Sequence, residues 1–124
     1  MKQMMAIAAG GAMGAVMRWY IAGFIQRLSG SAFPWGTLTV NIVGSFMLGF
    51  LFIWMLERVT VGELARLAVT VGFLGAFTTF STFSVETARL LQEGALSMAL
   101  GNVLAQVLIC VTLAWLGMQL ARML

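Results

Sequence analysis

The sequence lacks most of the residues on which enzymes and metal sites depend. Its 124 residues include no histidine, a single cysteine (Cys110) and a single proline (Pro34). Without histidine, and with one cysteine, the usual zinc sites and the Ser-His and Cys-His catalytic pairs cannot form. A lone cysteine also excludes an intrachain disulfide, and its simplest interpretation is a small buried apolar residue. We therefore expect a protein that is not an enzyme.

Charge is equally scarce. Only 9% of the residues are charged, whereas 61% are hydrophobic. A soluble domain of this length needs more charge on its surface. Four apolar stretches, each close to the roughly 20 residues that cross a bilayer, account for nearly the whole chain. They predict an all-α integral membrane protein, a single four-helix membrane domain over residues 1–124, with helices at about 4–25, 35–56, 64–91 and 96–119.

The first stretch has an alternative interpretation as a cleavable signal peptide, because Lys2 precedes a run of small apolar residues. The apolar character continues past Arg18 to about Phe24, and three more apolar segments follow it. A retained helix is therefore favoured. In the retained helix, Gly10 and Gly14 have the small-xxx-small spacing that lets two helices approach closely in lipid, and Gly44 and Gly49 offer similar sites in the second segment.

The positive charges indicate a membrane partner and leave the orientation open. Seven lysines and arginines oppose four acidic residues, and because they mostly flank apolar segments they indicate lipid anchoring, with no nucleic acid as a partner. Four spans put both termini on one side. The bias between the two sides is only about two charges, which permits insertion in either direction. The residues concerned are Lys2, Arg58, Arg66 and Arg122 on one side, and Arg27 and Arg89 on the other.

The third apolar segment contains a stretch that disfavours a helix. Residues 75–84 read "GAFTTFSTFS", a mixture of glycine, threonine and serine whose helix propensity is poor. This composition predicts a break in the third helix. Backbone groups freed by such a break must be satisfied by protein or water, so we expect the break to face the interior of an assembly.

Few polar side chains lie at membrane depth, and each costs free energy there, about 2.5–3.5 kcal/mol for a central charge on insertion scales. Arg18 either extends its side chain to the interface or provides a cation at the mouth of an anion path. Asn41 either forms an interhelical hydrogen bond or donates its NH₂ group to a passing anion. Asn102 and Gln106 share one helix face, which fits either a polar track or a polar seam between helices.

Two further features of the third segment have a structural and a functional interpretation. Glu86 is either paired with Arg89 three residues later, which we prefer, or buried and functional. Phe80 and Phe83 project from one helix face, and packing is the simplest reason for them. A benzene ring, however, has a positive edge that can meet a small hard anion. Hydroxyl donors would lie beside these edges, from Thr79, Ser81, Thr82 and Ser84.

Three motifs resemble one known family. The segments "GGAMGAVMRW", "PWGTLTVNIVGSF" and "TVGFLGAFTTFSTFSVE", in this order and in a four-span chain, resemble the Fluc (CrcB) fluoride channels of microbial inner membranes. The resemblance covers essentially the whole chain. It implies an antiparallel, dual-topology homodimer with two narrow pores, and a structural sodium ion at the dimer centre.

The resemblance also implies roles for individual residues. The sodium ligands would be the backbone carbonyls of Gly75 and Thr78. The pore would contain the remaining matched positions, Phe80, Phe83, Asn41, Ser81 and Thr82, with Arg18 in a vestibule. Asn102 and Gln106 would be pore donors on the fourth helix, and Glu86 a possible residue of the pore end.

These observations give one leading hypothesis and two rivals. The leading hypothesis is a fluoride-selective channel for passive fluoride efflux, which confers fluoride resistance. A small multidrug-type proton-coupled exporter would need a carboxylate in the first helix, where Arg18 is the only charge within the apolar run. A non-transporting structural membrane protein would explain the glycines but would leave the polar track without a purpose.

Overall fold

The computed structural model describes residues 1–124, apart from the side chain of Arg58. In this described part the chain forms helices and short connections, with no strand. Four of the helical segments are long and apolar enough to cross a membrane, at Lys2–Ser29, Trp35–Glu57, Glu63–Gln92 and Leu96–Met123. The predicted all-helical, multi-pass membrane protein is confirmed. The first segment is longer at both ends than the expected 4–25.

The first two spans are joined by a short turn. Helix α1 (Lys2–Ser29) ends at Gly30, whose backbone adopts a left-handed conformation with a φ of 55° that favours glycine. Pro34 then directly precedes α2 (Trp35–Ile53). A proline is tolerated there because no intrahelical hydrogen bond is lost at a helix start. The π-helical turn η1 (Trp54–Arg58) completes the second span.

The third and fourth spans are assembled from several helical segments. The third contains α3 (Glu63–Leu67), the π-helical η2 (Ala68–Leu74), α4 (Gly75–Phe77) and α5 (Phe80–Gln92). Between α4 and α5 the backbone is extended, with ψ angles of 156° at Thr78 and 117° at Thr79. The fourth contains α6 (Leu96–Leu104), the π-helical η3 (Ala105–Ile109) and α7 (Cys110–Met123).

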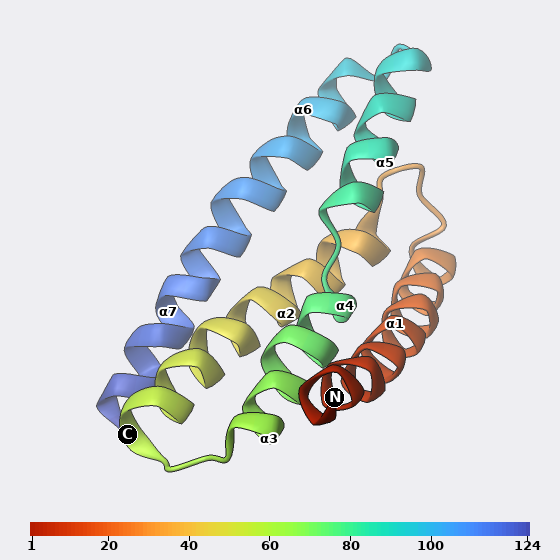
Figure 1. Ribbon diagram of the computed structural model, residues 1–124. Helices are drawn as coiled ribbons and strands as arrows, with labels where there is room; N and C mark the ends of the chain where they lie inside the picture. Colours follow the sequence, from red (N-terminus) through yellow and green to blue (C-terminus); the bar gives the residue numbers. More distant parts are fainter.

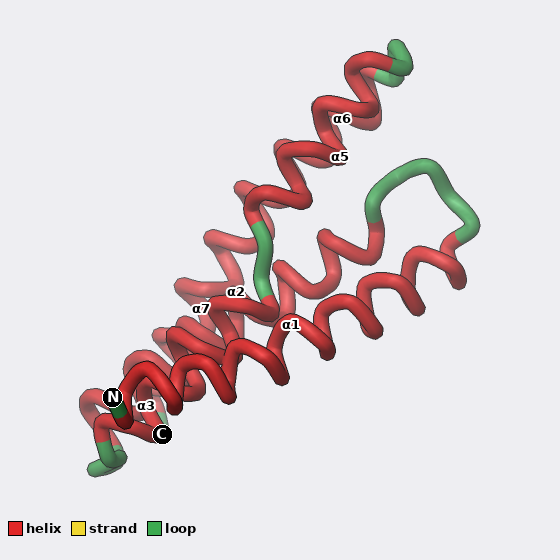
Figure 2. Tube along the Cα trace, turned by 45° about the vertical axis from the view of Figure 1, so that its right-hand side comes forward, coloured by secondary structure: helices red, strands yellow, loops and turns green.

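The four spans pack unevenly. In Figure 1, α2 lies between α1 on one side and α6–α7 on the other, and α2 and α7 form the most extensive contact. Helix α1 packs mainly against η2 and α4. The α5–α6 hairpin projects from this bundle, and Figure 2 shows the non-helical connection between α4 and α5 where it departs. The two termini lie at the same end of the molecule, as an even number of spans requires.

Glycines make the close helix contacts possible. A Cβ atom at Gly10 or Gly14 would collide with the backbone of Ala68 and Phe73, respectively, and one at Gly49 would collide with the backbone of Ala114. These contacts bring α1 against η2 and α2 against α7 and confirm the tight packing predicted for the first segment. Because helix association in lipid is driven by such packing, these positions hold the bundle together.

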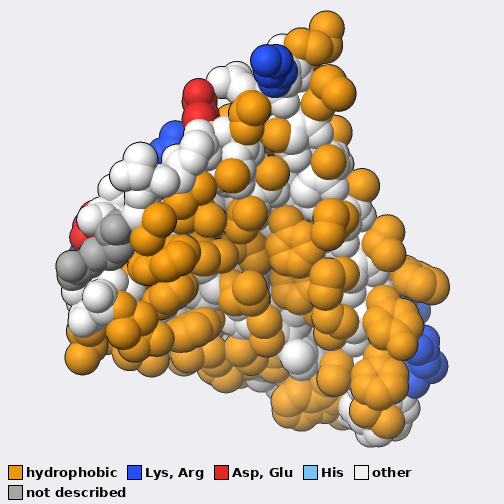
Figure 3. Space-filling view, turned by 90° about the horizontal axis from the view of Figure 1, so that it is seen from below, with side chains coloured by type: hydrophobic (Ala, Val, Ile, Leu, Met, Phe, Trp, Pro, Cys, Tyr) orange, Lys and Arg blue, Asp and Glu red, His pale blue; other side chains and the backbone are white. Residues whose placement is uncertain are grey.

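The surface is strongly apolar. Figure 3 shows hydrophobic side chains over most of the face in view, with charged side chains confined to its edges. Large apolar side chains that are more than 60% exposed include Trp19, Tyr20, Phe80 and Val111. Such an extended apolar surface is unsuited to water and suits contact with lipid or with other membrane-embedded protein.

Candidate functional site

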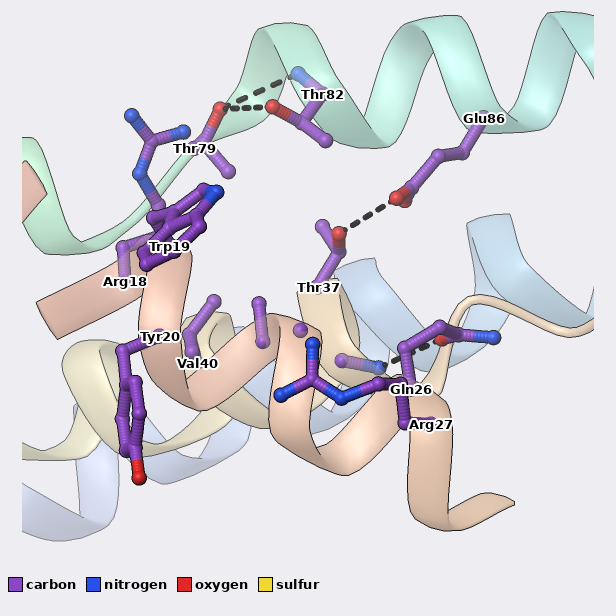
Figure 4. Close-up of a pocket in the computed structure, with 13 residues that line it drawn as sticks. Arg18, Trp19, Tyr20, Gln26, Arg27, Thr37, Val40, Thr79, Thr82 and Glu86 are labelled. Atoms are coloured by element: carbon purple, nitrogen blue, oxygen red, sulfur yellow. Dashed lines mark hydrogen bonds between the residues drawn. The ribbon is translucent and has the colours of Figure 1, made fainter. Parts of the chain in front are cut away.

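One cavity combines two arginines with one carboxylate. It has a volume of about 580 Å³ and lies between α1, the start of α2 and the first turns of α5. Arg18 and Arg27 line it from α1, Thr37 from α2, and Thr82 and Glu86 from α5 (Figure 4). We call it the arginine cavity. Its size exceeds that of a single small ion, so it can admit an ion together with its water.

Arg18 lines this cavity. Its Nε atom is buried and has no hydrogen-bond partner among the described residues. A guanidinium nitrogen has no acceptor capacity and can be satisfied only by an acceptor or an anion. The two interpretations of Arg18, a cation at a vestibule and a side chain that extends to the interface, both stay predictions.

Glu86 does not form the ion pair that we preferred from the sequence. Its Oε1 atom accepts a hydrogen bond of 2.7 Å from the Thr37 hydroxyl, and no ion pair with Arg89 occurs within the described side chains. Arg89 attracts the carboxylate only at longer range, and the direct partner is the Thr37 hydroxyl on the neighbouring helix. The other carboxylate oxygen, Oε2, is buried without a partner.

A second cavity contains the predicted phenylalanines. It measures about 240 Å³ and is lined by Asn41, Ser45, Thr78, Thr79, Phe80, Phe83, Gln106, Val107 and Cys110. We call it the phenylalanine cavity. Thr79 lines both cavities, so the extended segment before α5 separates one from the other. All the residues that line the two cavities belong to the four apolar segments long enough to cross a membrane.

The two phenyl rings meet edge to face. The ring centroids of Phe80 and Phe83 are 5.4 Å apart, with an interplanar angle of 62°. Phe83 is only 8% exposed, whereas Phe80 is 78% exposed. An edge-to-face pair turns the positive edge of one ring toward the other ring's negative face. The exposed Phe80 ring leaves much of its surface free for another molecule or another subunit.

Asn41 uses all its hydrogen-bonding groups within the protein. Its Nδ2 atom donates to the carbonyl of Thr79 and to Oε1 of Gln106, both at 3.0 Å, and its Oδ1 atom accepts from the Thr79 amide at 2.8 Å. Both N–H groups of the amide are therefore occupied. The interhelical hydrogen bond, one of the two interpretations of Asn41, is present, and it holds the extended backbone at Thr79.

Gln106 has the free donor that Asn41 lacks. It is 7% exposed, and its Nε2 atom has no hydrogen-bond partner among the described residues. Its Oε1 atom is held by Asn41, so the Nε2 end is the end left for a ligand. A buried unpaired N–H group costs about 1–3 kcal/mol, which a bound acceptor would relieve.

Hydroxyl groups surround the start of α5. The Thr79 hydroxyl accepts a hydrogen bond from the Thr82 amide at 3.2 Å and donates to the Thr82 hydroxyl at 3.0 Å. It also lies 3.3 Å from the Ser81 hydroxyl. Thr79 is thus the N-cap of α5, in the conformation that such a cap prefers.

Asn102 lies apart from this group. It is fully buried, and its Nδ2 atom donates to the Thr87 hydroxyl at 2.9 Å across the α5–α6 hairpin. It lines neither the arginine cavity nor the phenylalanine cavity. The structure therefore brings Asn41, Gln106, Phe80 and Phe83 together but leaves Asn102 in a polar seam between two helices.

Several lining residues were not identified as site residues from the sequence, Cys110 and Thr37 among them. Cys110 is partly exposed and lines the phenylalanine cavity, so its interpretation as a buried apolar residue was wrong. Its spacing of four from Gln106 was the available signal. Thr37 was missed as well, although it lies four residues before Asn41 on the same helix face.

This arrangement defines a class of protein: a multi-pass α-helical membrane protein with polar cavities at membrane depth. Residues 5–118 match the family described as CrcB-like protein, Camphor Resistance (CrcB), and the chain belongs to this family.

Similar proteins cover almost the full length. The chain is 50% identical over 117 residues to a protein of Magnetococcus marinus, covering 94% of this chain and 95% of that protein. It is 47% identical to one of Geobacter sulfurreducens over the whole of both chains. It is 44% identical to one of Citrifermentans bemidjiense over 98% of each. Each of these relatives is named fluoride-specific ion channel FluC.

Proposed function

We propose that this protein is a fluoride-selective channel that lets fluoride leave the cytoplasm passively and so lowers its toxicity. Its place would be the inner membrane of a microbial cell. The observation that carries the proposal is the full-length similarity to several proteins named for this activity. The polar cavities at membrane depth supply the chemistry that such an activity requires.

The mechanism follows from acid–base chemistry. Hydrogen fluoride is a weak neutral acid that crosses lipid and dissociates in a neutral cytoplasm, where the anion is trapped. A passive pore lets the membrane potential drive the anion outward.

To cross, fluoride must exchange part of its water for donors in the protein. Arg18 would attract the anion into the arginine cavity, and the Nε2 atom of Gln106 would meet it in the phenylalanine cavity. The ring edges of Phe80 and Phe83 would provide weaker contacts.

The hydroxyls of Ser81 and Thr82 would extend this route. They lie beside the Thr79 hydroxyl, and Thr79 and Thr82 line the arginine cavity. A hydroxyl rotates freely enough to donate to an ion and to accept from its neighbour in turn. Asn102 lines neither cavity and is bonded to Thr87 rather than placed beside the Thr79 hydroxyl, so it would play no direct part here.

We also propose that the protein works as an antiparallel, dual-topology homodimer. The small charge difference between its two sides permits both orientations. The exposed Phe80 ring, at the centre of a membrane span, supports a contact with a second subunit there.

A structural sodium ion would suit the extended segment. In an unbroken helix the amides of Thr79 and Thr82 would donate to the carbonyls of Gly75 and Thr78. Both amides donate instead to side chains, the first to Asn41 and the second to the Thr79 hydroxyl. The carbonyls of Gly75 and Thr78 are hard oxygen ligands and fit Na⁺. If they bind it, replacing Na⁺ by K⁺ should lower the melting temperature of the purified protein. Equal melting temperatures would contradict this site.

A liposome efflux assay tests the function. Purified protein should release fluoride rapidly from liposomes once a potassium ionophore dissipates the potential, with little chloride release and no need for a pH gradient. Absence of fluoride flux would overturn the proposal, and strict dependence on a proton gradient would favour a coupled exporter. The structure gives no support to that alternative, because α1 contains no acidic residue.

A further inference from the structure

One glutamine joins the end of the first span to the start of the second. Gln26 lies in the last turns of α1. Its Nε2 atom donates to the carbonyls of Ser31 at 2.8 Å and Phe33 at 3.1 Å, and its Oε1 atom accepts from the Gly36 amide at 3.1 Å. The first amides of a helix have no intrahelical acceptor. The Oε1 atom of Gln26 is the acceptor for one of them, the amide of Gly36. A single amide thus satisfies three backbone groups of the turn.

The backbone around this glutamine leaves little room for movement toward α1. A Cβ atom at Gly36 would collide with the carbonyl of Ala22, so the start of α2 already touches α1. Movement away from α1 would have to break the three hydrogen bonds of Gln26. Close packing and the Gln26 amide therefore fix the first turn of α2 from both directions.

That first turn carries the contact to α5. Thr37 follows Gly36 directly, and its hydroxyl donates to Glu86. In the described part of the chain, this bond and those between Asn41 and Thr79 are the side-chain hydrogen bonds that link α2 to the second half of the third span. The α5–α6 hairpin projects from the bundle (Figure 1), where α6 continues into η3 and α7 and these hydrogen bonds link α5 to α2.

Gln26 and Glu86 also share a wall. Both line the arginine cavity, and both line a neighbouring cavity of about 310 Å³ that Pro34, Arg89 and Glu93 complete. Figure 4 shows Gln26 and the Thr37–Glu86 hydrogen bond on the side of the arginine cavity away from Arg18. The connection from Gln26 through Thr37 to Glu86 therefore separates the two cavities.

We infer that Gln26 is a positioning residue: it holds the first turn of α2 so that Thr37 fixes Glu86 in the wall of the arginine cavity. The inference rests on the proposed function for its effect on flux. Its effect on the α2 start is independent of that function. No ion contact is assigned to Gln26 itself.

Two measurements on reconstituted protein separate these effects. Gln26→Met removes all three hydrogen bonds at similar volume, and Gln26→Glu keeps the acceptor for Gly36 but removes the donors. Both should speed amide hydrogen exchange at residues 35–38, and Gln26→Met should lower fluoride flux by roughly fivefold to tenfold, the scale of one or two lost hydrogen bonds. Gln92→Met, at an exposed glutamine, is the matched control and should change neither.

A double-mutant cycle then tests the route through Thr37. Thr37→Val should lower flux to a similar degree, and Gln26→Met should add little in its presence. Gln26→Met combined with Gln106→Met should instead be multiplicative. Independent effects of Gln26 and Thr37 would overturn the inference, as would unchanged exchange at residues 35–38. If wild-type protein gave no flux, the proposed function would fail, while the exchange measurement would still decide on Gln26 at the α2 start.

Discussion

Gln106 and Asn41 show how two similar side chains divide their tasks. Both are buried amides at the phenylalanine cavity, and both are hydrogen-bonded to each other. Both N–H groups of the Asn41 amide donate to acceptors of the protein, whereas Gln106 retains an unpaired N–H group. A polar side chain in a membrane is thus no proof of an ion contact, since an amide whose donors are occupied acts on its neighbours and an amide with a free donor can act on the ion.

The first prediction concerns Gln106. Gln106→Glu retains an oxygen that can accept from Asn41 but replaces the unpaired N–H group by a carboxylate oxygen that repels an anion. Fluoride flux should fall by tenfold or more, because tenfold corresponds to only about 1.4 kcal/mol. The measurement is initial efflux from liposomes at equal protein content. Gln119→Glu, on α7 and outside both cavities, should retain wild-type flux; a similar loss in both variants would remove Gln106 from the ion path.

The residues around the site could be predicted only in part. The sequence singled out Asn41, Phe80, Phe83 and Gln106, and the structure groups them around one cavity. It did not indicate the partner of Glu86, because the Thr37 hydroxyl is separated from it by 49 residues. Spacing along one helix predicts neighbours on that helix, whereas contacts between helices depend on rotations and crossing points that a single sequence does not encode in its periodicity.

At the scale of helices, the segment between α4 and α5 depends on its neighbours. Thr78 and Thr79 are extended within the stretch where propensity disfavours a helix. Asn41 satisfies the backbone of Thr79, and Gly44 lets α2 come within contact of the side chain of Thr78. Non-helical backbone at membrane depth requires such support. Propensity indicated the place; the supporting residues became evident only from the packing of α2.

A prediction for Asn41 follows from this support. Asn41→Ala leaves the amide and carbonyl of Thr79 without their partners and releases Gln106. Fluoride flux per folded protein should fall by about tenfold or more, the effect of losing two or three buried hydrogen bonds, while dimer formation persists. Size-exclusion chromatography and liposome efflux measure the two properties.

Asn102→Ala is the matched control for Asn41. It also removes a buried amide, but one that lies outside both cavities. It should reduce the melting temperature without a comparable loss of flux per folded protein. Equal flux losses in the two alanine variants would contradict the separate roles of the two asparagines.

A second prediction at this scale concerns Gly44. Gly44→Ala places a methyl group against the side chains of Thr78 and Phe77, so we expect destabilisation of about 1–3 kcal/mol, the usual cost of overpacking. Thermal unfolding in detergent measures the change. Gly11→Ala is the control, because its methyl group would make only an ordinary contact with the carbonyl of Gly72. It should be neutral or stabilising, by up to about 1 kcal/mol of helix propensity.

At the scale of the whole molecule, composition alone predicted the four spans. The scarcity of charge and the length of the apolar stretches were sufficient, because a bilayer imposes a thickness on every helix that crosses it. The details within each span were less accessible. The π-helical turns η1, η2 and η3 have no signal in the apolar pattern, since an extra residue in one turn alters hydrogen bonding without changing hydropathy.

The proposed dual topology gives a prediction for the entire chain. Thr60 and Gly62 lie in the connection between the second and third spans, on the side of the two termini. Thr60→Lys combined with Gly62→Lys doubles the charge bias from about two to about four and should direct most copies into one orientation. Cellular fluoride resistance should then fall, since antiparallel partners become rare.

Two further experiments test whether a loss of resistance comes from the changed orientation. The same positions changed to glutamine should leave resistance unchanged. Co-expression of the lysine variant with wild type should restore it, because wild-type copies supply the opposite orientation. Full resistance from the lysine variant alone, with a single orientation established by reporter fusions, would contradict the antiparallel arrangement.

The projecting α5–α6 hairpin has a consequence for the life of a newly made chain. If subunits pair as proposed, a single copy leaves the hairpin and the Phe80 ring facing lipid until another copy arrives. Assembly is then a second-order process in the plane of the membrane, so halving the concentration of unpaired copies reduces the rate of pairing about fourfold. The number of working channels would fall more steeply than the number of chains, and unpaired copies would stay open to membrane proteases for longer when expression is low.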